Sequence, residues 1–182
     1  MDELFKGRHF EREVIVLCVR WYLRFKLSFR DLVEMMAERG LGLAHTTIMR
    51  WVQRFVPEFE KRWNRFARKS GRTWRVDETY VKIRGKWTYL YRAVRELPAQ
   101  SPCWKDTRLR SSKYFNNMME QDHRGVKSRI IPMFGFKVFD RAAVTIAGVE
   151  LLHRIRKGQF NLRRLRVAGQ AAPAIWNAVL SA

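Results

Sequence analysis

Apolar side chains recur at helical spacing through the first third of the chain. Between Glu11 and Phe25 they lie three or four positions apart, at Ile15, Cys18, Tyr22 and Phe25. This spacing predicts an amphipathic helix with a single inward stripe. A second helix is predicted to begin after Ser28. The Ser28 hydroxyl can cap it, and the Asp31 carboxylate, three residues later, can accept a hydrogen bond from the Ser28 amide. Gly40 provides a natural C-terminal stop.

A third helix is predicted to begin near Thr46 and to turn Ile48, Trp51, Val52 and Phe55 inward. Two helices, a glycine-bearing turn and another helix have the form of a helix-turn-helix. Its outer side would carry short hydroxyl groups and arginines that can contact phosphates or base edges, namely Thr46, Thr47, Arg50 and Arg54. An ordinary three-helix bundle with a solvated basic face fits the same pattern. We assign residues 1–56 to a helix-turn-helix DNA-binding domain and 57–71 to a helical linker.

From Trp74 the hydrophobic period changes from about 3.6 to 2, which indicates strands. Alternation over Trp74–Ile83 and Trp87–Val94, joined by a glycine-bearing turn, predicts a β-hairpin with Asp77 inside its first strand. Residues 97–107 show no consistent pattern. A helix is then predicted over Tyr114–Arg129, and a last long helix runs from Phe139 to its stop at Gly158.

Composition narrows the class of partner. The 182 residues are 47% hydrophobic, as in a globular protein, and carry 37 Lys plus Arg against 17 Asp plus Glu, a net charge of +20. Such an excess of positive charge favours a polyanionic partner. We therefore interpret the first three helices as a DNA-binding module. A ribosomal or chromatin protein would have a similar charge. Cys18 and Cys103 are read as reduced structural thiols of a cytoplasmic protein. The longest apolar run, Ala142–Leu152, is too short for a membrane span.

Two acids are candidates for metal-dependent chemistry. Asp77 lies within a predicted strand, and Glu120 lies on a predicted helix whose 4-3-4 spacing places Asn116, Glu120, His123 and Lys127 on one face. Two-metal nucleases and transposases require carboxylates that converge on a pair of Mg²⁺ ions, and oxygen ligands suit this ion. Most isolated acids on strands and helices are surface residues, so spacing alone leaves both interpretations open.

The residues around these acids resemble a known family. The segments W-R-V-D-E-T-Y-V-K-I-R-G-K-W-T-Y-L-Y-R-A-V, K-Y-F-N-N-M-M-E-Q-D-H-R, S-F-R-D-L-V-E-M-M-A-E-R-G and F-D-R-A-A-V-T-I-A-G-V-E-L-L-H-R-I-R-K-G-Q-F resemble DDE transposases of insertion sequences, most nearly bacterial insertion-sequence family six. The resemblance covers residues 1–96 and about 108–180. It implies a mixed α+β chain, in which helix-turn-helix helices precede an RNase H-like α/β catalytic domain at 72–182.

The resemblance also implies roles for individual residues. Asp77 would be the first catalytic acid and Glu120 the last, both acting as Mg²⁺ ligands. Arg124, one turn after Glu120, would contact phosphate, and Lys127 on the same face could hold DNA. The expected partner is double-stranded DNA, at transposon ends and target, bound by a homodimer or by a mixed dimer with a full-length copy. No membrane partner is expected. A DNA partner implies a cytoplasmic, nucleoid-associated location.

The chain departs from the family between the two acids. The family has a second catalytic aspartate on a later strand, whereas here Glu96 leads directly to L-P-A-Q. Neither Asp106, in a loop-like stretch, nor Asp122, about 100° around the helix from Glu120, replaces it. We therefore predict an internal deletion near 96–108 that leaves the first strand with an open edge and a small, poorly covered sheet. DNA binding without efficient strand transfer is expected. The alternatives are a non-catalytic protein that occupies transposon ends or inhibits a full-length copy, and an unrelated helix-turn-helix regulator.

Overall fold

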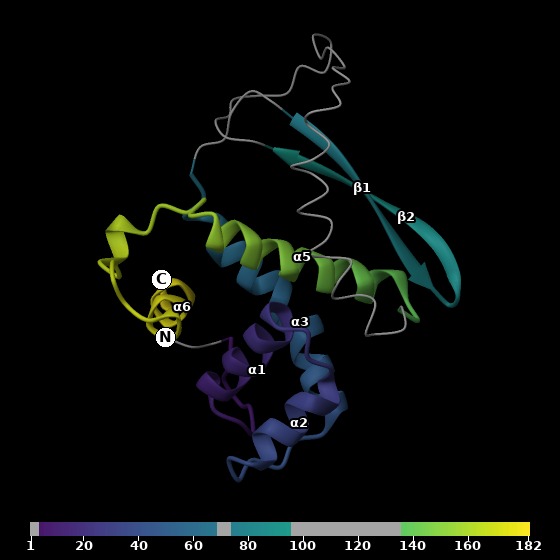
Figure 1. Cartoon of the computed structure of the whole chain (residues 1–182). Coiled ribbons are helices and arrows are strands. Elements are labelled where there is room, and N and C mark those ends of the chain that lie inside the picture. The colour runs from purple at the N-terminus through teal and green to yellow at the C-terminus, as the bar shows by residue number, and fades with distance from the viewer. Residues whose placement is uncertain (1–3, 69–73, 96–135) are drawn as a thin grey trace. The chain divides into compact units, whose positions relative to one another are not determined.

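The computed structural model describes residues 4–68, 74–95 and 136–182 (Figure 1). In chain order these contain α1 (Arg12–Arg24), α2 (Phe29–Ala37), α3 (His45–Asn64), β1 (Trp74–Ile83), β2 (Lys86–Arg95), α5 (Phe139–Arg156), the short 3₁₀ helix η3 (Arg163–Leu165) and α6 (Ala172–Ser181). They divide into a helical unit, residues 1–67 with 138–182, and a hairpin unit, residues 68–137. The mixture of helices and a small two-stranded sheet agrees with the expected α+β class.

The first two helices follow the sequence pattern with one exception. Ile15, Cys18 and Tyr22 of α1 are buried as predicted. Phe25 was predicted to share their stripe, but it is 45% exposed, because α1 ends at Arg24 and the backbone at Phe25 is extended. The predicted cap of α2 is confirmed. The Ser28 hydroxyl accepts from the Asp31 amide at 3.1 Å, and the Asp31 carboxylate accepts from the Ser28 amide at 2.7 Å.

Helix α3 is a single element of 20 residues that runs through Pro57. Proline has no amide hydrogen, so this helix lacks one internal hydrogen bond, and packing must hold its last turns. Phe59 and Trp63 provide that packing, since both are fully buried. The Trp176 ring of α6 lies 5.3 Å from the ring of each, and the Phe160 ring lies 5.0 Å from that of Trp63.

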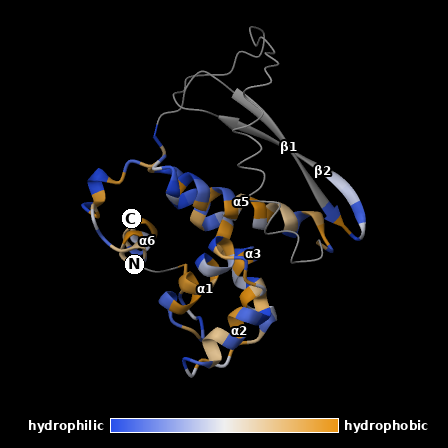
Figure 2. Cartoon of the chain, viewed as in Figure 1, coloured by the Kyte–Doolittle hydropathy of each residue, from blue (hydrophilic) through white to orange (hydrophobic). Residues whose placement is uncertain are grey.

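The C-terminal helices complete the core that the first three begin. Helix α5 packs against α3 and α1, and Figure 1 shows it beside α3. Helix α6 is fixed by hydrogen bonds from Arg12 to the Asn177 carbonyl, at 2.9 Å, and from Arg62 to the Leu180 carbonyl. Figure 2 shows hydrophobic stretches on all four of these helices. The helical unit therefore has a single hydrophobic core, and residues from both the first and the last part of the chain contribute to it.

The hairpin unit contains the strand that carries Asp77. β1 and β2 pair antiparallel from Trp74↔Arg95 to Ile83↔Lys86, as the alternation predicted. Both residues of the connecting turn have positive φ, 48° at Arg84 and 81° at Gly85, which is the type I′ geometry that matches strand twist. At the turn end, Phe136 exchanges backbone hydrogen bonds with Lys82 and Arg84, at 2.8 and 2.9 Å. This isolated bridge is the only further pairing of β1 in the part of the hairpin unit that the structure describes.

Candidate functional site

A cationic strip of α3 is the first candidate site, formed by Thr46, Thr47, Arg50 and Arg54 and called here the α3 face. Thr46, Arg50 and Arg54 are exposed and Thr47 is half-buried. Spacing by four residues places exposed side chains on one side of the helix, as the sequence predicted. The opposite side enters the core, where Ile48, Val52 and Phe55 have no exposed surface. The anchored side therefore fixes the direction in which the α3 face points.

The turn before α3 determines where this face begins. Helix α2 ends in a pair of hydrogen bonds, from the Leu41 amide to the Met36 carbonyl and from the Gly40 amide to the Ala37 carbonyl, with Gly40 at φ 73°. This is a Schellman arrangement, which requires the left-handed conformation that glycine adopts freely. Leu43 then inserts into the core at 7% exposure. The chain is thus reversed and anchored before α3 starts.

The N-terminus of α3 is open to an anion. Its N-cap residue, Ala44, makes no side-chain capping bond, and the first turn contains no acidic residue. The first amide groups of a helix have no partner within the helix, and its dipole is positive at this end. A phosphate near Thr46 would meet amide donors, a hydroxyl group and the Arg50 guanidinium together. This arrangement suits contact with a nucleic-acid backbone.

The acidic candidates are only partly described. Asp77 lies in β1, where its Cα is paired with that of Arg92 on β2. Glu120, Arg124 and Lys127 lie outside the described residues, as do Asp106 and Asp122. Among the side chains that the structure describes, which do not include that of Asp77, no three His, Cys, Asp or Glu gather as a metal site. Asp77 can supply the carboxylate oxygen that Mg²⁺ prefers. The assignment of Asp77 and Glu120 as a metal pair stays a prediction.

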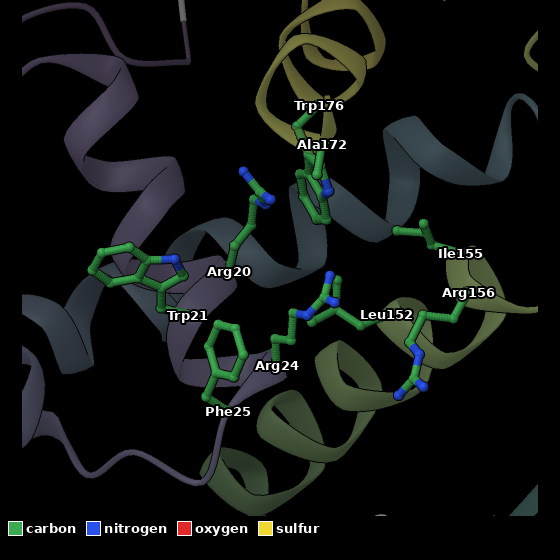
Figure 3. Close-up of a pocket in the computed structure, with 9 residues that line it drawn as sticks. All are labelled: Arg20, Trp21, Arg24, Phe25, Leu152, Ile155, Arg156, Ala172 and Trp176. Carbon is green, nitrogen blue, oxygen red and sulfur yellow. The ribbon is translucent and has the colours of Figure 1, made fainter. Parts of the chain in front are cut away.

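A second feature of the helical unit was missed by the sequence reasoning. Residues of α1, α5 and α6 line a cavity of about 130 Å³, the α1–α6 pocket, which includes Arg20, Arg24, Arg156 and Trp176 (Figure 3). Arg20 is only 9% exposed, and burial, followed by the nearby charge of Arg24, lowers its pKa. The sequence signal was a pair of arginines four residues apart in a helix that is otherwise largely apolar on that side.

Cys18 has no part in a reactive site. It is fully buried in α1, as its place in the apolar stripe predicted. Burial raises the pKa of the Cys18 thiol to about 11, against a smaller opposing effect of Arg39. The thiol therefore stays protonated and unreactive near neutral pH. Cys103 lies outside the described residues.

Comparison with known proteins places the chain among DNA transposases. A family model described as "DDE domain" matches it in two segments, residues 71–98 and 92–159. The "Transposase for insertion sequence-like element IS431mec" of Staphylococcus aureus is 30% identical over 213 residues, with 91% of this chain and 93% of the relative covered. The "Transposase for insertion sequence element IS257 in transposon Tn4003" of the same species gives the same identity and coverage.

The chain therefore belongs to the DDE transposases of insertion sequences, in the group of insertion-sequence family six. This confirms the family that the sequence motifs indicated. No solved structure matches the chain. None of the helices in the described part of the chain is long and apolar enough to cross a membrane.

Proposed function

We propose that this protein binds the terminal inverted repeats of an insertion sequence and carries out strand transfer poorly or not at all. In this proposal α2, the turn and α3 form the helix-turn-helix, and the α3 face enters the major groove. The observation that supports it most directly is the α3 face, with Arg50 and Arg54 exposed beside an uncapped helix N-terminus. A net charge of +20 supports a DNA partner independently.

The proposal that the catalytic domain is shortened rests on the comparisons and on the sequence. The alignment to the relatives runs over 213 residues, which is longer than this entire chain of 182. The matched family model divides into two segments that overlap at residues 92–98, where an uninterrupted domain would give one continuous match. This break adjoins the stretch at 96–108 where the second aspartate-bearing strand is missing. An RNase H-like domain over 72–182 that lacks this strand is the arrangement we propose.

DDE transposases as a class use divalent metal ions. In this chain Asp77 and Glu120 are the proposed Mg²⁺ ligands, and Arg124 and Lys127 are proposed to hold DNA phosphates beside Glu120. The ion, when bound, would activate a water or a 3′-hydroxyl and offset charge on phosphorus. Two of the three family carboxylates leave the ion with fewer protein oxygen ligands than the family normally supplies. Strand transfer should therefore be weak.

Binding can be tested with fluorescently labelled duplexes that carry either the inverted repeats flanking the gene or a scrambled sequence. Replacing Arg50 by Ala should cost about 1–3 kcal/mol on the repeat if Arg50 reads a base, with a smaller loss on the scrambled duplex. Arg8→Ala is the matched control, because Arg8 is also exposed and lies before α1. Equal losses for both variants on both duplexes would contradict helix-turn-helix recognition.

Catalysis is tested separately, in a Mg²⁺-dependent joining assay on inverted-repeat DNA. The expected result is binding of the DNA without efficient joining. Robust joining that is abolished by Asp77→Ala would overturn the proposed defect, since it would show that the two remaining acids suffice.

The missing aspartate favours one alternative, a non-catalytic protein that occupies transposon ends or inhibits a full-length copy through mixed dimers. In that case Glu120→Gln should leave the footprint on the terminal repeats unchanged. Adding this protein to an active full-length transposase should then lower its joining rate. A footprint that requires Glu120 would instead indicate that the acid still takes part in assembling the complex.

A further inference from the structure

The α1–α6 pocket brings positive charge together without a described acidic partner. Arg20 and Arg24 of α1 and Arg156 of α5 line it, and no Asp or Glu is among its lining residues. Figure 3 shows Arg20, Arg24 and Trp176 extending from α1 and α6 around one space. The cavity measures about 130 Å³. One water needs only about 10–15 Å³ of such space, so a phosphate group has room.

Arg20 is the most buried cation in this pocket and has donors that a ligand could use. Its side chain is 9% exposed, and its guanidinium lies 5.6 Å from the Trp176 ring centre. Within the described residues it makes neither a hydrogen bond nor an ion pair. A guanidinium offers five N–H donors, and no nitrogen of Arg20 is among the described side-chain atoms that are fully buried without a partner, so its donors remain accessible to a ligand. Stacking on Trp176 stabilises the cation but satisfies none of these donors.

The walls of the pocket add further anion-binding groups. Ala172, the first residue of the 10-residue helix α6, lines it, and α6 has no side-chain cap. The first-turn amides of a helix lack internal partners and lie at the positive end of its dipole. In α6 Pro173 has no amide hydrogen, so the donors of this turn come from the residues on either side of it. The connection between the α5 and α6 walls carries exposed Arg163, Arg164 and Arg166. An extended polyanion could therefore continue from the pocket along this connection.

We propose that the α1–α6 pocket holds one phosphate group of the DNA backbone, as a contact separate from the α3 face. The buried Arg20 would donate to the phosphate oxygens, Arg24 would close over them from the more exposed side, and the α6 amides would complete the cradle. The inference rests on the proposed DNA-binding function. A DNA phosphate is favoured over a lone carboxylate because a row of exposed arginines follows the pocket along the chain.

The test measures how DNA affinity depends on salt. Anisotropy titrations with the labelled inverted-repeat and scrambled duplexes, between about 50 and 200 mM salt, give the slope of log affinity against log salt. Arg20→Met and Arg24→Gln should each reduce the magnitude of this slope by about 0.9, the value for one phosphate contact, equally on both duplexes. Arg8→Gln, the charge-matched control, should change it less. Circular dichroism confirms that each variant is folded.

The double variant separates a shared site from a general loss of charge. If both arginines hold the same phosphate, Arg20→Met with Arg24→Gln should reduce the slope once, by about 0.9, and not twice. If folded Arg20 and Arg24 variants keep the wild-type salt slope, the proposed phosphate site in the pocket is wrong, but the proposed DNA-binding function is unaffected. Absence of any DNA binding by the wild-type protein would instead overturn the proposed function. If the wild-type protein binds no DNA, the pocket is tested by adding inorganic phosphate and measuring the unfolding temperature. A thermal stabilisation that Arg20→Met abolishes would assign the pocket to free phosphate and exclude the DNA backbone.

Discussion

Helix α5 lies close to α1 and α3 at Gly148, where there is no room for a side chain. A Cβ atom added there would lie 2.7 and 2.9 Å from the two methyl carbons of Leu23 on α1, and 2.9 Å from a methyl carbon of Val56 on α3. Leu23 is 1% exposed and Val56 is 0% exposed, so neither can move into solvent. Glycine at 148 therefore sets how closely α5 approaches the first helices.

Gly148→Ala should destabilise the helical unit despite its better helix propensity. Forcing a methyl group into a packed core costs about 1–3 kcal/mol. Alanine returns about 0.8–1 kcal/mol, because it is a better helix former than glycine. The net expectation is a loss of about 1 kcal/mol, or a midpoint lower by roughly 2–4 °C for a protein of this size.

A double-mutant cycle with Leu23→Ala tests whether the cost of Gly148→Ala comes from the contact with Leu23. Leu23→Ala alone should cost about 2–5 kcal/mol, because it opens a cavity at the contact. In that background Gly148→Ala should become stabilising, because the new methyl group occupies the vacated space. The coupling energy should be about 0.5–3 kcal/mol. Urea unfolding followed by far-ultraviolet circular dichroism gives all four values. Stabilisation by the same amount in both backgrounds would refute the close packing of α5 on α1.

Three further predictions concern single side chains. Ser28→Ala should cost about 1 kcal/mol in urea unfolding, because the Asp31 amide loses its side-chain cap. The Ser28 backbone amide, and then its side chain, lower the pKa of Asp31, so the stability that Asp31→Asn removes should be fully present at neutral pH and be lost as the pH falls through that lowered pKa; a pH-independent loss would contradict it. Trp176→Ala should cost about 3–5 kcal/mol, whereas Trp87→Ala, at a residue 67% exposed, should leave the unfolding midpoint nearly unchanged. In a variant whose other cysteine is serine, Cys18 should react with a thiol reagent at pH 8 only after unfolding, since burial raises its pKa to about 11.

Local signals in the sequence predicted the local structure well. The cap at Ser28, the stop at Gly40 and the turn at Arg84 and Gly85 each depend on residues within six positions of one another, so a short stretch of sequence contains the cause. Phe25 was misplaced because helical spacing continues past Arg24, whereas the backbone does not. Helix α6 was not predicted at all. Its buried residues, Trp176, Val179 and Leu180, do have helical spacing, but the stretch A-P-A-I-W-N-A-V-L-S is too short and too apolar for that spacing to stand out in the sequence.

The two candidate sites differ in how far the sequence reveals them. The α3 face lies on one helix, so its spacing alone places Thr46, Arg50 and Arg54 together. The α1–α6 pocket joins Arg20 to Trp176, which lies more than 150 positions later, and no periodicity relates such distant residues. Arg20 could have been singled out only as a charge within an apolar stretch, and such a charge is usually read as a surface residue.

The division of the chain bears on the proposal that a transposase shortened in its middle still presents a DNA-binding surface. In the C-terminal half of α3, Phe59 and Trp63 are covered by Phe160 and by Trp176 of α6, which come from the far end of the sequence. The shortening proposed near 96–108 lies within the hairpin unit, between the two segments that build this core. Such a deletion removes none of the side chains that support the α3 face. If the proposed function holds, DNA binding and strand transfer can therefore be lost independently, and the proposed deletion would affect strand transfer first.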